Sequence, residues 1–66
     1  MTICIQHEAG TFYTSGYDSV TAVVNAIESG AEIDVWWFDQ KGSRYRETMW
    51  FATEHLVGVR TERDDG

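Results

Sequence analysis

The pattern of apolar and polar residues along the chain changes period twice, and each change marks an expected element. Two short β-rich runs, residues 2–7 and 11–15, are separated by the letters EAG, whose glycine can adopt a positive φ, so they predict a hairpin. Over residues 17–30 the apolar positions recur at the i, i+3, i+4 and i+7 spacing of an amphipathic helix. This stripe consists of Val20, Val23, Val24 and Ile27.

Beyond the helix the period returns to two. Residues 33–38 predict a third strand, the letters DQKG predict a turn, and residues 44–52 predict a fourth strand. The letters TEH predict one helical turn or a tight bend, and residues 56–61 predict a last strand with Val57 and Val59 pointing inward. The expected order is β-β-α-β-β-β, an α+β fold with one helix packed on a small antiparallel sheet.

The chain has 66 residues, which is close to the lower limit for a single hydrophobic core. We expect one domain over residues 1–61 and a frayed acidic tail over residues 62–66, which lack apolar anchors. A helix with one apolar stripe covers only part of such a sheet, so some apolar strand surface should stay uncovered. The thin margin of stability also makes a homodimer an expected form.

The third predicted strand contains the adjacent residues Trp36 and Trp37, which must point to opposite faces. The register of the following hairpin decides which one enters the core. A three-residue loop QKG, with its glycine in the left-handed conformation, places Trp36 opposite Arg46. A loop with one residue more or fewer places Trp37 opposite Arg46 and mixes apolar and charged residues on both faces. The glycine position and the cleaner segregation favour the first register.

In the favoured register one face of the hairpin is a core wall with a single misplaced charge, and the other face is amphipathic. The core face is expected to collect Ala31, Ile33, Val35, Trp37, Tyr45, Glu47, Met49 and Phe51. The outer face is expected to carry Trp36, Phe38, Trp50, Arg44 and Arg46, beside Glu32, Asp34 and Thr48. Cation–π contacts between these arginines and rings are expected to organise the outer face.

Two interpretations of the outer aromatic residues stay open. The first hairpin or the tail can fold over them and bury both sides of the sheet. Alternatively they form a contact surface, since Trp, Phe and Arg are enriched at interface hot spots. The commonest partner of such a patch is a second copy of the same chain, related by twofold symmetry. If self-association uses this face, an acidic surface formed by the first 40 residues becomes the expected site for a partner protein.

The charge is unevenly distributed. The first 40 residues contain six acidic residues and no Lys or Arg, 0 − 6 = −6, whereas residues 41–66 balance at 5 − 5 = 0. The predicted acidic surface consists of Glu8, Asp18, Glu28, Glu32, Asp34 and Asp39. Phosphate backbones repel such a chain, so direct binding of nucleic acid is not expected. An alternative is that these carboxylates imitate DNA phosphates and inhibit a nucleic-acid-binding protein.

The residues that carry chemistry are few and show no catalytic motif. If the first and last strands are neighbours, a ligand or metal site or an acid–base pair could be formed by Cys4, His7, Glu8, Glu54 and His55. No spacing typical of metal ligands supports this alternative. Cys4, between two isoleucines, is expected to be a small buried apolar residue. We therefore predict no enzyme activity, no cofactor and no metal.

Localisation follows from the absence of targeting signals in these 66 residues. The N-terminal letters MTICIQHEAG contain no basic region, and no window approaches the ~20 apolar residues of a membrane span. A single cysteine is typical of a reducing compartment. We predict a cytoplasmic protein without a membrane partner. The composition is similar to that of accessory proteins of phages and mobile elements, many of which bind or inhibit a host protein.

Overall fold

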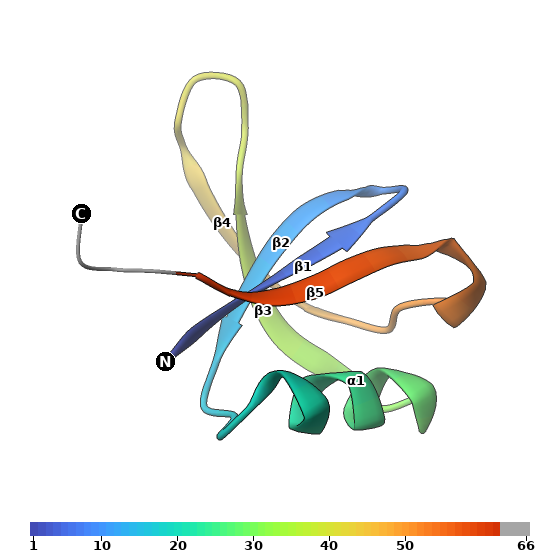
Figure 1. Cartoon of the computed structure of the whole chain (residues 1–66). Coiled ribbons are helices and arrows are strands. Elements are labelled where there is room, and N and C mark those ends of the chain that lie inside the picture. The colour runs from blue at the N-terminus through green and yellow to red at the C-terminus, as the bar shows by residue number, and fades with distance from the viewer. Residues whose placement is uncertain (63–66) are drawn as a thin grey trace.

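The computed structural model describes residues 1–62 as one α-helix, one short 3-10 helix and five strands (Figure 1). The strands form one antiparallel sheet in the order β4-β3-β2-β1-β5. The predicted α+β class and the order of the elements are confirmed. The elements are β1 (Thr2–His7), β2 (Gly10–Ser15), α1 (Val20–Glu28), β3 (Ile33–Phe38), β4 (Arg44–Met49), η1 (Thr53–His55) and β5 (Leu56–Glu62).

The helix α1 is capped by a serine at its start and is followed by a glycine at its end. The Ser19 hydroxyl accepts a hydrogen bond of 3.1 Å from the Ala22 N–H and so caps the first turn. Gly30 follows the last turn with a φ of +79°, a conformation that glycine adopts without strain. Val23 and Ile27 are buried against one face of the sheet. Within the described part of the chain, no helix is long and apolar enough to cross a membrane.

The hydrophobic core surrounds the central strand β1. Ile3 and Ile5 point toward α1, and both side chains are 0% exposed. Cys4 between them points to the opposite face and is also 0% exposed. Burial of each large apolar side chain contributes about 1.5–3 kcal/mol relative to its exposure. The remaining core residues are Phe12, Val23, Ile27, Ile33, Val35 and Phe51.

The β3–β4 hairpin has the predicted register. Trp36 lies opposite Arg46, and the Asp39 N–H donates a 3.0 Å hydrogen bond to the Ser43 carbonyl. Gly42 closes the turn with a φ of +84°. The register therefore directs Trp36 away from α1 and its neighbour Trp37 toward the core side.

The pairing between β2 and β3 is short. Only one residue pair is in register there, Tyr13 opposite Trp36, within the described residues. The buried Thr14 hydroxyl adds a 2.7 Å hydrogen bond to the Asp34 carbonyl. Past this junction the β3–β4 hairpin projects away from the other three strands and from α1 (Figure 1). As a consequence the outer half of this hairpin extends beyond the core.

The prediction that Val57 points inward is wrong. The register between β1 and β5 shifts so that His7 pairs with Leu56 whereas Gln6 pairs with Gly58. This β-bulge leaves Val57 without a partner, and it is 69% exposed. Leu56 takes the inward position in its place, and Val59 packs against the core as predicted.

Two predicted boundaries also differ from the structure. Strand β4 ends at Met49 rather than at residue 52, because its partner β3 begins at Ile33, opposite Met49. The chain then bends and buries Phe51 in the core, where it is 2% exposed. Strand β5 includes Glu62, one residue beyond the predicted end of the domain, and the rest of the predicted tail, residues 63–66, lies outside the described residues.

Candidate functional site

The face of the sheet opposite α1, here called the open face, is uncovered by any other element in residues 1–62. Its middle is a row of directly paired residues that crosses all five strands. The first hairpin does not fold over this face, because β1 and β2 lie within the same sheet. From β5 to β4 the row consists of Arg60, Cys4, Tyr13, Trp36 and Arg46.

Three aromatic rings gather on the open face where β2 meets β3. Tyr13 stacks on Trp36 with 6.1 Å between the ring centroids and 23° between the planes. Phe38 approaches Tyr13 edge-on, also at 6.1 Å. Phe38 is 50% exposed and Trp36 is half-buried. Tyr13, Trp36 and Phe38 are called the aromatic cluster below, and it presents apolar surface to the solvent.

Two arginines of β4 border the aromatic cluster. Arg46 is directly opposite Trp36, but the cation–π contact is made by its diagonal neighbour Arg44, whose guanidinium carbon lies 5.1 Å from the centroid of the Trp36 ring. Neither arginine has an ion pair among residues 1–62. Both guanidinium groups therefore keep their charge available to a ligand. The aromatic cluster with Arg44 and Arg46 is called the open-face site.

The structure brings together four of the five residues predicted for this surface. Trp50, the fifth, lies past the end of β4 and is 60% exposed. Its indole nitrogen is 3.7 Å from the position that a Cβ on Gly30 would occupy. Tyr13 is the residue that the sequence interpretation missed. The inward positions of Phe12 and Thr14 imply that Tyr13 points outward, but only the pairing of β2 with β3 places it beside Trp36.

Contacts on the core side of the β3–β4 hairpin explain why the charged residue Glu47 lies among residues expected in the core. Trp37 and Tyr45 stack with 4.6 Å between ring centroids and 20° between planes. The Trp37 indole N–H donates a 2.9 Å hydrogen bond to the Glu47 carboxylate. The hairpin projects beyond α1, so Glu47 stays exposed to solvent although it is on the core side of the sheet.

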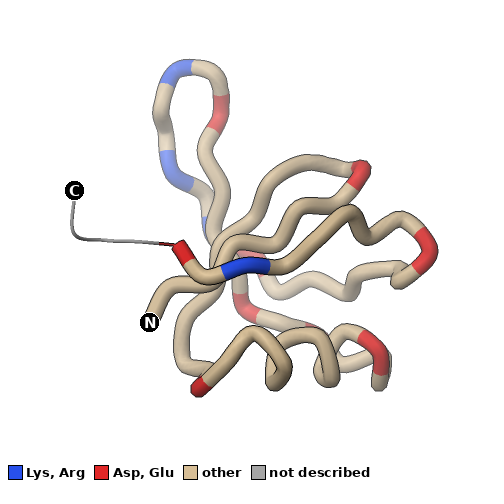
Figure 2. Tube along the Cα trace, in the orientation of Figure 1, with Lys and Arg blue, Asp and Glu red and all other residues tan. Residues whose placement is uncertain are grey.

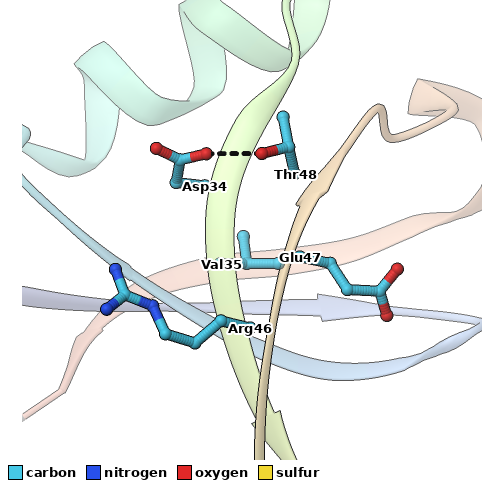
Figure 3. A pocket seen from close by; sticks show the side chains of 5 residues that line it. All are labelled: Asp34, Val35, Arg46, Glu47 and Thr48. Carbon is cyan, nitrogen blue, oxygen red and sulfur yellow. Dashed lines mark hydrogen bonds between the residues drawn. The ribbon is translucent and has the colours of Figure 1, made fainter.

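A shallow polar hollow of about 310 Å³ lies along β3 and β4. The Thr48 hydroxyl donates a 2.6 Å hydrogen bond to the Asp34 carboxylate at one end of it. Arg46 and Glu47 project to opposite sides of β4 in Figure 3. The Asp34 carboxylate is thus held by Thr48 while the Arg46 guanidinium extends freely. The hollow is lined by Asp34, Val35, Arg46, Glu47 and Thr48.

The carboxylate of Asp39 organises the turn of the hairpin. It accepts hydrogen bonds of 2.9 Å from the N–H groups of Lys41 and Ser43 and one of 3.0 Å from the Tyr45 hydroxyl. The hydrogen bond from Ser43 is the main cause that holds the pKa of Asp39 below its ordinary value of 3.8. The Asp39 carboxylate therefore stabilises the turn.

The six residues of the predicted acidic surface belong to several separate segments of the chain, as the spread of red segments in Figure 2 shows. They lie at the β1–β2 turn, before and at the end of α1, before β3, and in the β3–β4 hairpin. In that order they are Glu8, Asp18, Glu28, Glu32, Asp34 and Asp39. That these six carboxylates imitate DNA phosphates stays a prediction.

Basic residues gather more closely than acidic ones. Lys41, Arg44 and Arg46 all belong to the β3–β4 hairpin, as the blue segments of Figure 2 show. Arg60, the remaining basic residue among residues 1–62, lies on β5 with its guanidinium 3.6 Å from the Glu62 carboxylate. The open-face site therefore lies on the hairpin that holds three of the four Lys and Arg residues among residues 1–62, together with Asp34, Asp39 and Glu47.

The two histidines meet because β1 and β5 are neighbours, as the sequence allowed. Their ring centroids are 6.1 Å apart. His7 uses both ring nitrogens: Nδ1 accepts from the Ala9 N–H at 3.1 Å, so Nε2 donates to the Ala52 carbonyl at 3.0 Å. His55 Nδ1 lies 2.5 Å from the Glu8 carboxylate. Among residues 1–62 no three His, Cys, Asp or Glu side chains could hold a metal ion. This cluster connects the β1–β2 turn to η1.

Cys4 is buried on the open-face side of β1, which confirms that it is a small core residue. Burial raises the pKa of its thiol, against the opposing effect of the Arg60 guanidinium. A buried thiol with a raised pKa is a poor nucleophile.

Comparisons with protein-family models, curated proteins and solved structures give no match for this chain. A function must therefore be argued from the geometry of the open-face site.

Proposed function

We propose that this chain is a protein-interaction module that binds a partner protein through the open-face site. The observation that carries the proposal is the aromatic cluster on the side of the sheet opposite α1, where Phe38 is exposed and Tyr13 and Trp36 are half-buried. Tyr, Trp and Arg dominate interface hot spots, because they bury large areas and offer directional polar groups. The site combines these residue types within one small surface.

The charge of the site favours a partner of different sequence over a second copy. Arg44 and Arg46 give the site a local positive charge. A twofold axis through the site would bring the arginines of both copies together. An acidic partner surface with apolar groups satisfies Arg44, Arg46 and the aromatic cluster together. The homodimer expected from the sequence stays a prediction, which sedimentation velocity of the purified protein tests.

Affinity capture tests the proposal with two tryptophan variants. Trp36→Ala removes the centre of the aromatic cluster, and Trp50→Ala removes an exposed tryptophan outside it. Wild type and both variants are immobilised, exposed to a lysate of the encoding organism, and the retained proteins are quantified by mass spectrometry. The protein captured by wild type is then purified, and its affinity for each variant is measured by calorimetry. We expect Trp36→Ala to weaken binding about 30-fold or more, a loss typical of a hot spot.

The same experiment includes the results that would contradict the proposal. Trp50→Ala should bind within about twofold of wild type, since surface substitutions outside an interface are nearly neutral. Equal binding by Trp36→Ala and wild type, with both folded by circular dichroism, would rule out the open-face site. A wild-type dimer that Trp36→Ala dissociates would assign the site to self-association instead.

A further inference from the structure

Strand β4 forms a free and regular edge of the sheet. It pairs with β3 over its whole length without a bulge, and residues 44–48 are all exposed. The chain contains no proline that would block further pairing. The other edge, β5, carries a β-bulge at Val57 and an ion pair between Arg60 and Glu62. Of the two sheet edges formed by residues 1–62, β4 is the one that keeps the features of an edge that accepts another strand.

The backbone groups available at this edge follow from the turn. Asp39 and Ser43 share a backbone hydrogen bond, and hydrogen-bonded pairs alternate along an antiparallel ladder. Tyr45 and Glu47 consequently face β3 with their N–H and C=O groups. The corresponding groups of Arg44, Arg46 and Thr48 point away from β3 toward solvent. These three residues offer their backbone donors and acceptors to an added strand.

The side chains at the edge define the partner's charge. Arg44 and Arg46 point to the open face and have no ion pair among residues 1–62. The nearby carboxylates keep their charge but are bonded to neutral donors, Asp34 to the Thr48 hydroxyl and Glu47 to the Trp37 indole N–H. Tyr45, between the two arginines, points to the other face, where its ring stacks on Trp37. The edge thus alternates basic, aromatic and basic side chains.

We infer that the partner supplies an extended acidic segment, which adds to the free edge of β4 as a sixth strand. This inference rests on the proposed function and specifies how the partner is recognised. Side chains of an added strand lie beside those of β4 on each face. The matching segment carries two acidic residues opposite Arg44 and Arg46, with one apolar residue between them opposite Tyr45.

A second copy of the chain fits this edge poorly. In a symmetric pair of β4 strands, a twofold axis at Arg46 would place the two Arg46 side chains opposite each other. Like charges directly across two strands are destabilising. An acidic peptide instead converts the same position into an attractive pair, so charge complementarity selects the partner segment.

Synthetic peptides provide the probes. The first is a capped seven-residue peptide that alternates valine and glutamate, and the second has lysine in place of each glutamate. A third retains valine and glutamate but is N-methylated at alternate backbone amides, so it cannot complete a ladder. Binding to the whole chain is measured by NMR. We expect the first peptide to shift the amide signals of Arg44, Arg46 and Thr48 and to slow their hydrogen exchange, with neither effect from the other two.

Two matched pairs of variants separate charge from backbone pairing. Arg46→Glu and Arg60→Glu change the net charge equally, but only the first is on β4. We expect Arg46→Glu to weaken binding of the acidic peptide at least about tenfold and Arg60→Glu to leave it within about twofold. Thr48→Pro removes an outward N–H without breaking the ladder to β3, whereas Thr48→Val keeps it. Only Thr48→Pro should lose binding.

Failure of this inference differs from failure of the proposed function. Equal binding of the lysine or N-methylated peptide, or full binding by Thr48→Pro, would overturn strand addition. If the acidic peptide does not bind but the captured partner still requires Trp36, strand addition is wrong and the open-face site stands. If the captured partner also binds Trp36→Ala normally, both are wrong.

Discussion

The two hairpins of the sheet, β1–β2 and β3–β4, are built alike but occupy opposite environments. Each is antiparallel with six residue pairs in register. In β1 three consecutive residues, Ile3, Cys4 and Ile5, are 0% exposed, whereas residues 44–48 of β4 are all exposed. The difference comes from position, because β1 has strands on both sides and β4 has a strand on one. The first hairpin supplies stability, and the second presents side chains to solvent.

The largest expected effect is a loss of folding stability from a substitution in the buried β1–β2 hairpin. Ile5→Ala should lower the free energy of unfolding by about 2–5 kcal/mol, because it leaves a cavity at a fully buried position. A domain of this size has a total stability of about 3–5 kcal/mol, so this variant should be largely unfolded. Tyr45→Ala in β4 should cost about 1–3 kcal/mol, through the lost stacking on Trp37 and the lost hydrogen bond to Asp39. Urea denaturation followed by circular dichroism measures both values.

If Ile5→Ala does not fold at all, Ile5→Val gives the measurable value. It should cost about 0.5–1.5 kcal/mol, the usual range for one buried methylene group. Equal losses for Ile5→Ala and Tyr45→Ala would show that the two hairpins share stability evenly.

A smaller effect on stability is expected at β5, where the β-bulge leaves Val57 exposed while Val59 packs against the core. Val59→Ala should lower the free energy of unfolding by about 1–2 kcal/mol, because Val59 packs against the core. Val57→Ala should change it by less than about 0.5 kcal/mol, because the side chain is 69% exposed. Urea denaturation of this matched pair reports on the bulge. A larger loss for Val57→Ala would place that residue inward and contradict the bulge.

The smallest effect concerns the turn of the exposed hairpin. The pKa of Asp39 is lowered in the folded chain, chiefly by the hydrogen bond from Ser43. The stabilisation of the turn is therefore fully present above pH 3.8, the ordinary value, and is lost as the pH falls through the lower folded-state pKa. An NMR titration of the Asp39 carboxyl group should give a midpoint below 3.8.

The amide signals of the turn provide the control for this titration. The signal of Ser43 should move with the same midpoint in the wild-type chain and should not move over that range in Asp39→Asn. A midpoint at or above the ordinary value would mean that the turn hydrogen bonds do not hold in solution.

Features set by neighbouring residues could be predicted from the sequence. The helix stripe of Val20, Val23, Val24 and Ile27 predicted α1, and the glycine of the QKG loop predicted the register of β3 with β4. The register in turn placed Trp36 and Trp37 on opposite faces. These features depend on the period of side chains and on the conformation of a short turn, and both are visible in a local stretch of sequence.

Features set by distant residues could not be predicted in the same way. The contact of Tyr13 with Trp36 requires β2 beside β3, and no turn connects those two strands. The bulge at Val57 depends on how β5 fits against β1, and the position of Trp50 depends on where β4 loses its partner. The sequence contains each residue but not the pairing that places it.

The pairing of β5 with β1 has a consequence for the synthesis of this chain. Residues 56–62 complete the sheet by lying beside residues 2–7, which leave the ribosome before them. Until β5 emerges, β1 has an unpaired edge and the growing chain cannot close its core. Completion of the sheet therefore waits for the synthesis of β5, and a ribosome that stalls before Leu56 holds a nascent chain whose most apolar strand is still open to other proteins.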